Sequence, residues 1–202
     1  MNFVVAQELF DQMDFQLEQW VNRHAGASPA LDFGMRLLAS RGEYLFLLAL
    51  AGWFLFGWIR ARPEEREGAL LALAAALLAL LLNQLVSHAW PRHRPFVAHP
   101  HLVRLLIPHS RDRSFPSDHA SASFAIAFVL FARHRRLGIG LMAAAALMGF
   151  ARVFVGVHYP LDIAGGIAIG FGAAALLLRY RRPITDARLL LDRAMARLGL
   201  LR

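Results

Sequence analysis

Residues 68–86 read GALLALAAALLALLLNQLV, and this stretch decides the fold. Up to Leu82 it contains only glycine, alanine and leucine. A helix that crosses a membrane needs about 20 consecutive, mainly apolar residues, so the stretch predicts a transmembrane helix. Polar side chains at membrane depth are candidates for a functional site. Such side chains follow at the end of this run: Asn83, Gln84, Ser87 and His88.

The composition of the whole chain also indicates a membrane protein. Of its 202 residues 57% are hydrophobic, whereas about 45–50% is usual for soluble domains. The formal net charge is +8 and all 22 Lys and Arg residues are arginine. No basic face is interleaved with aromatic side chains, so we expect no nucleic-acid partner. The chain has no cysteine, which excludes disulfides, thiolate metal sites and cysteine nucleophiles.

Four further apolar segments complete the predicted bundle. They cover residues 44–59, 116–132, 137–157 and 160–178. The last of them contains several glycines, which let helices approach one another closely within a membrane. We therefore expect an all-α integral membrane protein, a bundle of about five to six transmembrane helices within one domain.

Amphipathic segments flank this bundle on both sides. Residues 3–21 and 30–40 place apolar side chains at helical spacing, but their charges are too frequent for a membrane span. We expect interfacial helices within residues 1–42 and the transmembrane bundle within residues 43–182. Residues 183–202 predict a basic amphipathic helix on the surface.

The distribution of arginine predicts the orientation. If five spans alternate, the arginine-rich segments 60–66, 133–136 and 179–202 fall on one face, which is cytoplasmic by the positive-inside rule. Residues 60–66 are expected to form a tight polar hairpin. The long loop 90–115 then faces outward, and its arginines are assigned to a site. The N-terminus also lies outside, unless residues 30–40 are buried more deeply.

Polar groups are predicted to meet at the outward ends of the spans, at residues 93–95, 117–119 and 152–162. They contain histidines, arginines and a carboxylate. This set suits phosphoryl transfer, which needs a nucleophile, a proton donor and cations around the phosphate oxygens. His158 and Asp162 stand four residues apart across a Tyr-Pro pair. The carboxylate can therefore reach back to the imidazole and fix its tautomer.

The segment SRDRSFPSDHA, residues 110–120, predicts an anion site at a helix start. Ser114 or Ser117 can cap the helix, and Pro116 suits its first turn. The unpaired N–H groups of a helix start attract an anion. His119 adds a side chain that can give or take a proton near neutral pH.

Three motifs carry a resemblance to a known family. Arg94-Pro95, residues 114–119 and residues 151–162 resemble, in order and spacing, the motifs of the type 2 phosphatidic acid phosphatase superfamily of membrane lipid phosphatases. The resemblance covers about residues 80–175. The Ser-Phe-Pro-Ser-Asp-His form of the second motif and the preceding Asn83-Gln84 are most similar to the bacitracin-resistance branch, the undecaprenyl-diphosphate phosphatases.

The resemblance implies a mechanism and a setting. His158 would be the nucleophile that forms a phosphohistidine, Asp162 would orient it, and His119 would protonate the leaving group. The loop 90–115 would be the catalytic loop. The reaction would convert undecaprenyl diphosphate, a polyprenyl diphosphate, to its monophosphate and so recycle the cell-wall lipid carrier. The enzyme would lie in the bacterial cytoplasmic membrane, its site facing the periplasm or cell exterior.

The resemblance also implies how the phosphate is held, without a metal or other cofactor. The expected phosphate-binding residues are Arg94, Ser117, Asp118 and Arg152.

The sequence departs from the family pattern at two positions. Many members carry a lysine seven residues before the arginine of the first motif, where this chain has Ser87, so Arg92 or His93 is an accessory candidate for the missing contact. Asp118 stands where glycine is commoner. Its carboxylate next to an anion suggests a part in selecting a diphosphate or in tuning the neighbouring histidine.

The sequence also suits other functions. Another lipid phosphate, such as phosphatidylglycerol phosphate or phosphatidic acid, would suit the same motifs. A non-enzymatic haem-binding or transport protein is a more distant alternative, because the mid-membrane positions lack histidine. A zinc site is also disfavoured, since the spacing of the loop histidines matches no tight ligand pattern. These are His88, His93, His99, His101 and His109.

Overall fold

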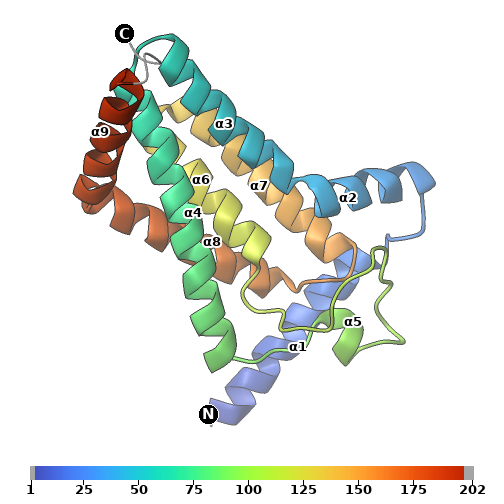
Figure 1. Cartoon of the computed structure of the whole chain (residues 1–202). Helices are drawn as coiled ribbons and strands as arrows, with labels where there is room; N and C mark the ends of the chain where they lie inside the picture. The colour runs from blue at the N-terminus through green and yellow to red at the C-terminus, as the bar shows by residue number, and fades with distance from the viewer. Residues whose placement is uncertain (1–2, 198–202) are drawn as a thin grey trace.

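The computed structural model describes residues 3–197, and every regular element in this range is a helix (Figure 1). The helices are α1 (Phe3–Asn22), α2 (Pro29–Arg41), α3 (Glu43–Ile59), α4 (Pro63–Ala89), α5 (Pro95–Ala98), α6 (Asp118–Arg133), α7 (Arg135–Phe154), α8 (Pro160–Arg179) and α9 (Arg182–Arg197). The prediction of an all-α protein is confirmed. The last residues of the predicted basic tail, 198–202, lie outside the described range.

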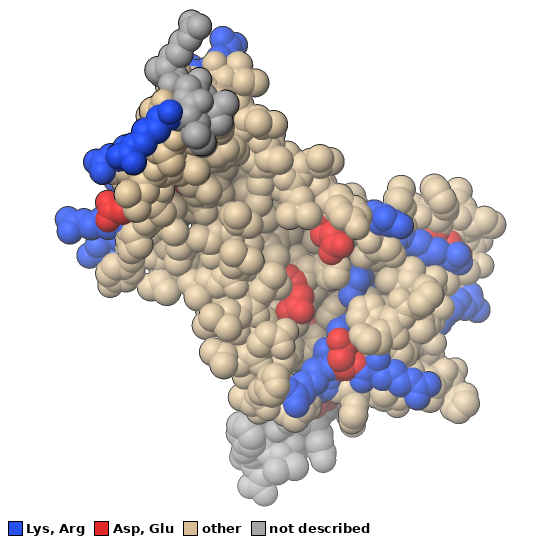
Figure 2. All heavy atoms as spheres, viewed as in Figure 1, with Lys and Arg blue, Asp and Glu red and all other residues tan. Residues whose placement is uncertain are grey.

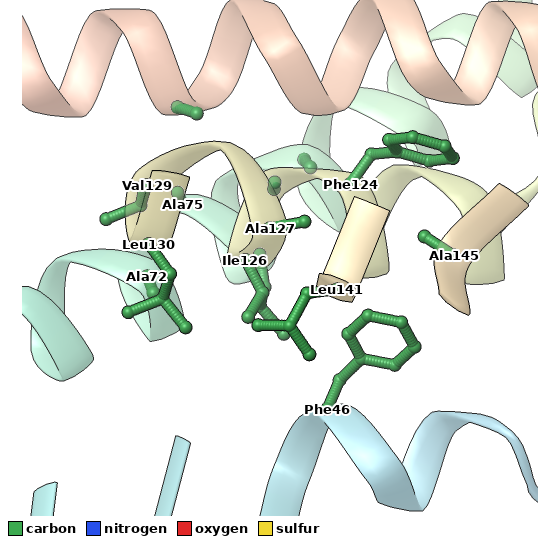
Figure 3. Close-up of a cluster of buried hydrophobic side chains, with 14 of the residues drawn as sticks. Phe46, Ala72, Ala75, Phe124, Ile126, Ala127, Val129, Leu130, Leu141 and Ala145 are labelled. Atoms are coloured by element: carbon green, nitrogen blue, oxygen red, sulfur yellow. The ribbon is translucent and has the colours of Figure 1, made fainter. Parts of the chain in front are cut away.

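Helix α6 lies at the centre of the bundle and packs against α3, α4, α7 and α8 (Figure 1). Figure 3 shows Phe124, Ile126 and Leu130 of α6 among side chains of α3, α4 and α7. The α4 contribution to this core is mainly alanine, which lets the helix backbones approach closely. The first residues of α6 are therefore held firmly relative to the neighbouring helices.

Three helices, α4, α7 and α8, are long and apolar enough to cross a membrane. Helices α2 and α3 pass the same test only as a pair, bent by 52° at their junction. Helix α6 has 16 residues, fewer than the roughly 20 that a straight span requires. The protein is thus a multi-pass membrane protein with three or four candidate spans within residues 3–197, and the predicted number of five to six is not confirmed.

Charged side chains gather at two ends of the visible face, and a broad band with few charges lies between them (Figure 2). One end holds α9 and the start of α4, and the other holds α2, α1 and the long loop (Figures 1 and 2). A belt of this kind suits a bilayer, whose interior excludes unpaired charges.

The expected polar hairpin at 60–66 is shorter in the structure, because α4 already begins at Pro63. Glu65, Arg66 and Glu67 are buried in its first turns rather than exposed in a loop. Arg66 donates a hydrogen bond of 3.1 Å to Asp192 of α9. The prediction was wrong here because partners on other helices neutralise these charges, which a local reading of the sequence does not reveal.

Helix α1 crosses the end of the bundle where the long loop lies (Figure 1) and contacts α7 and α8. Asn22 at its end donates hydrogen bonds of 2.9 Å to the carbonyls of Arg104 and Phe154. Gly156, with φ +83°, turns the chain just after α7 ends. A Cβ there would come within 2.9 Å of the Arg104 carbonyl, so this crowded turn requires glycine.

Candidate active site

The structure brings the predicted polar groups together at one end of the bundle. Residues of each group line a cavity of about 600 Å³ between the long loop, the start of α6 and the connection from α7 to α8, whereas Ser117 and Asp162 are buried and do not line it. The start of α8 lies directly against the start of α6, where a Cβ on Gly166 would come within 2.8 Å of the Ser117 carbonyl. Ser117 also donates its N–H to the Asp162 carbonyl at 3.1 Å. These close contacts fix the second and third motifs relative to each other.

His158 lies in the short connection before α8, only 2% exposed. Its Nδ1 is 3.2 Å from Oδ2 of Asp162, as the spacing predicts. The same Oδ2 accepts the N–H of Tyr159 at 2.9 Å. The Nε2 atom faces Arg94 Nη1 at 3.1 Å and Arg152 Nη2 at 3.5 Å. Since a guanidinium only donates, Nε2 carries the lone pair and Nδ1 the proton.

Burial lowers the pKa of His158 well below its ordinary value, and the charges of Arg152 and Arg94 act in the same direction. The imidazole is therefore neutral at physiological pH. Its Nε2 lone pair lies beside two cations, so an anion drawn to them meets a nucleophile.

Arg94 is oriented by fixed partners. Its Nε donates to Oδ1 of Asp112 at 2.6 Å, and its Nη1 donates to the Val157 carbonyl at 2.9 Å. The side chain of Asp112 is 59% exposed, at the mouth of the cavity. Nearby Arg94 contributes to holding the pKa of Asp112 below its usual value, so the carboxylate stays ionised at neutral pH.

Arg152 reaches the same point from the last turn of α7. Its Nη1 donates to the Ala39 carbonyl at 3.1 Å, and its Nη2 lies 2.7 Å from Nε2 of His109. Burial and the charge of Arg94 lower the pKa of His109, so this ring is neutral and can accept from Arg152. Neither His109 nor Asp112 was predicted to be a site residue, because both lie in an irregular loop without periodicity.

Ser117, rather than Ser114, is the N-cap of α6, and its Oγ accepts a long hydrogen bond of 3.5 Å from the Ala120 N–H. Ser114 instead donates its N–H to the Arg92 carbonyl at 2.8 Å. Pro116 precedes the cap, so its predicted place in the first helical turn is wrong. The start of α6 nevertheless faces the cavity, as expected of an anion site.

Asp118 is held by the polar end of α4. Asn83 donates from Nδ2 to Oδ1 of Asp118 at 2.8 Å and accepts from the hydroxyl of Ser121 at 3.0 Å. This contact explains why the apolar run of α4 ends in Asn83. It ties α4 to the first turn of α6, and Asp118 still lines the cavity.

His119 also lines the cavity, and its Nε2 lies 2.9 Å from Oε2 of Glu43. Glu43 is the first residue of α3 and was not predicted to be part of the site. Its only signal in the sequence is its place directly before a long apolar segment.

The three accessory candidates lie in different settings, although all line the cavity. Ser87 donates its hydroxyl to the Gln84 carbonyl at 3.2 Å, and His93 pairs through its backbone with Arg113. Arg92 is engaged with carboxylates, Asp14 at 2.7 Å and Asp162 at 3.1 Å. Within residues 3–197, no three His, Asp or Glu side chains are grouped so that they would hold a metal ion.

Comparisons with known proteins identify the family of this chain. The family model described as PAP2 superfamily matches residues 68–186. Undecaprenyl-diphosphatase BcrC from Bacillus subtilis (strain 168) is 31% identical over 177 residues, which are 86% of this chain and 89% of the relative.

Two solved structures are similar. LpxE from Aquifex aeolicus superposes with a TM-score of 0.68 at 28% identity and covers 82% of this chain and 94% of its own. The first transmembrane PAP2 type phosphatidylglycerolphosphate phosphatase from Bacillus subtilis has a TM-score of 0.65 at 24% identity, covering 87% and 88%. The family match and the extent of these similarities establish that the chain belongs to the PAP2 superfamily.

Proposed function

We propose that this phosphatase hydrolyses undecaprenyl diphosphate to undecaprenyl phosphate. The similarity to an undecaprenyl-diphosphatase along most of both chains supports this substrate. The observation that carries the chemistry is the position of His158 Nε2 beside the guanidinium groups of Arg94 and Arg152.

The first chemical step would transfer the terminal phosphoryl group to His158. Arg94 and Arg152 hold its oxygens and stabilise the charge of the transition state. Nε2 attacks phosphorus, and the bond from phosphorus to the bridging oxygen breaks. Asp162 accepts a hydrogen bond from Nδ1 and stabilises the ring as it becomes positively charged. The charge of the bound diphosphate, together with Glu43, favours protonation of His119, and the departing undecaprenyl phosphate takes this proton.

The second step would release phosphate. Water attacks the phosphohistidine, a new P–O bond forms and the bond from Nε2 to phosphorus breaks. His119, which has given up its proton, accepts one from the water. Glu43, 2.9 Å from Nε2 of His119, is placed to orient the ring in both steps.

A second cavity offers a binding site for the lipid tail of the substrate. A space of about 250 Å³ lies between α3, α4 and α6 and is lined mainly by apolar side chains such as Phe46, Leu73 and Ile126. It shares Asp118 and His119 with the polar cavity. A substrate with a phosphate head and a hydrocarbon tail matches this pair of adjoining spaces.

We further propose that the protein lies in a bacterial cytoplasmic membrane with the site facing outward. The turn between α3 and α4 and the start of α7 lie at the opposite end from the site (Figure 1), and the arginines that they carry, Arg60, Arg62, Arg135 and Arg136, are exposed. The positive-inside rule places such an end in the cytoplasm.

A phosphatase of another lipid phosphate is the alternative. The fold is shared with a protein named as a phosphatidylglycerolphosphate phosphatase, and nothing in the arginine pair around His158 requires a diphosphate. Phosphatidylglycerol phosphate and phosphatidic acid are the substrates to compare.

Purified protein in detergent, assayed in EDTA, tests the proposal with a panel of lipid phosphates. We expect phosphate release to be fastest from undecaprenyl diphosphate. The His158→Ala variant should lose activity at least about 1,000-fold, because no other group replaces the nucleophile. Full activity of this variant would disprove the mechanism, and faster release from a glycerolipid phosphate would favour the alternative substrate.

A further inference from the structure

Arg92 forms an ionic connection between α1 and the carboxylate that orients His158. The guanidinium Nη1 lies 2.7 Å from Oδ2 of Asp14 and 3.1 Å from Oδ1 of Asp162. The exposed fraction of the Arg92 side chain is 14%, and both carboxylates are fully buried. One nitrogen therefore bridges two anions that belong to different helices.

Both oxygens of Asp162 have assigned partners. Oδ2 accepts from His158 and from the N–H of Tyr159, and Oδ1 accepts from Arg92. The direction in which the carboxylate faces the imidazole thus depends on Arg92. Without Arg92, the negative charge on Oδ1 would be buried with no cation next to it, which would destabilise the folded protein.

Asp14 also contacts the first turn of α8, which contains Asp162, through its second carboxylate oxygen. Its Oδ1 accepts the N–H of Leu161 at 2.9 Å, one of the N–H groups in the first turn of α8 that has no partner within the helix. Asp14 therefore holds both Arg92 and the backbone beside Asp162. The amphipathic pattern of α1 predicts only an interfacial helix and gives no sign of this role.

The geometry of the site suits arginine and not lysine. The Arg92 guanidinium lies over the Tyr159 ring, 3.9 Å from its centroid, while Nη2 reaches Asp11 at 3.2 Å. A planar group with several donors can stack and bridge at once, which a lysine ammonium cannot do.

We infer that Arg92 and Asp14 are positioning residues of the active site, acting on the nucleophile through Asp162. Helix α1 then contributes a positioning residue, Asp14, to the active site. Arg92, a candidate substitute for the missing family lysine, serves the nucleophile and not the phosphate. This inference rests on the proposed role of His158.

Arg92 and Asp14 should also affect the pH dependence of the reaction. The charged and titratable groups that face His158 are Asp162 of α8, Arg152 of α7, His119 of α6, and Arg94 and His109 of the loop. Arg92 and Asp14 add one positive and one negative charge behind Asp162.

Removal of each charge moves the pKa of His158 in a different direction. Loss of Arg92 leaves the Asp162 charge uncompensated, which favours the imidazolium and raises the His158 pKa. Loss of the Asp14 charge lowers it. Since the nucleophile must be neutral, the acidic limb of kcat/KM should move to higher pH in Arg92→Gln and to lower pH in Asp14→Asn.

The experiment compares kcat, KM and pH profiles of these two variants and of Arg92→Lys, with whichever lipid phosphate the wild type hydrolyses. We expect kcat to fall about 10- to 100-fold with KM little changed, because a small misplacement of a reacting group can cost about 100-fold. Arg92→Lys should keep the wild-type pH limb while kcat falls, because it keeps the charge and loses the planar fork.

Matched controls make the same chemical changes at exposed positions. Arg23→Gln and Asp186→Asn should leave kcat and the pH limb unchanged, and the thermal midpoint in detergent identifies any variant that is unfolded. If Arg92→Gln is unfolded, Asp14→Asn and Arg92→Lys carry the test.

Wild-type pH limbs in both Arg92→Gln and Asp14→Asn, or shifts in the same direction, would overturn the inference. Failure of the proposed function gives a different result. In that case His158→Ala would retain activity, or the wild type would hydrolyse no lipid phosphate at all.

Discussion

His158 shows how a single residue acquires its chemistry from its surroundings. Asp162 fixes the proton on Nδ1, and the arginines face the free lone pair on Nε2. Burial keeps the imidazole neutral, so the nucleophile is ready at physiological pH without a separate base.

Asp162→Asn should reduce kcat by about 10⁴-fold with a small change in KM, because an amide can present its N–H to Nδ1 and stabilise the wrong tautomer. Steady-state kinetics with the preferred lipid phosphate measures this. Asp112→Asn is the control, since it contacts Arg94 and not the imidazole. Equal losses in both variants would contradict the assigned role of Asp162.

The sequence predicts local contacts between residues well and distant ones poorly. His158 and Asp162 are four residues apart, so helical geometry alone predicts their pairing. Arg92 and Asp14 are 78 residues apart, and the pairing of Glu43 with His119 also joins separate helices. No periodicity connects such residues, and these contacts depend on how the helices pack.

Among the helices, α1 departs most from its expected role. Its amphipathic pattern predicts an interfacial helix but not that it contributes Asp14 and Glu18 to the interior near the site. The apolar segments were easier to predict, because their composition alone requires a membrane. The start of α4 could not be predicted, since the burial of Arg66 there depends on a partner in another helix.

Glu18 gives α1 a pH-dependent stability. The glutamate is fully buried, and burial together with the charge of Asp14 raises its pKa to about 8. Between about pH 4.5, the ordinary value, and about pH 8 the unfolded chain has lost this proton while the folded protein keeps it. The stability contributed by the protonated carboxyl is therefore fully present below pH 4.5 and is lost as the pH rises to about 8.

The Glu18→Gln variant should not show this loss of folding stability as the pH rises. The thermal midpoint of the variant in detergent should exceed that of the wild type by a margin that grows from pH 5 to pH 8, equivalent to about a few kcal/mol at most. Glu64→Gln, at an exposed position, is the matched control and should show no such trend. A constant difference across this pH range would contradict a raised pKa.

At the scale of the whole molecule, two charged ends enclose an apolar middle (Figure 2). The bundle holds the long loop, the start of α6 and the connection from α7 to α8 so that three segments distant in sequence share one cavity. The motifs predict which residues meet, but only the packing of α8 on α6 fixes how closely they meet.

The orientation in the membrane can be tested directly because the chain has no native cysteine. Single cysteines at His101, in the loop beside the site, and at Arg136, at the opposite end, are both exposed positions. A membrane-impermeant maleimide applied to intact cells or spheroplasts should label His101→Cys and not Arg136→Cys. The reverse pattern would place the site on the cytoplasmic side.

The most direct test of the central claim is to trap the covalent intermediate. Rapid quenching of the wild type with undecaprenyl diphosphate labelled in its terminal phosphate should yield an acid-labile, alkali-stable phosphate on the peptide that contains His158, and His158→Ala should yield none. Turnover without any labelled peptide, or label on another residue, would contradict the account.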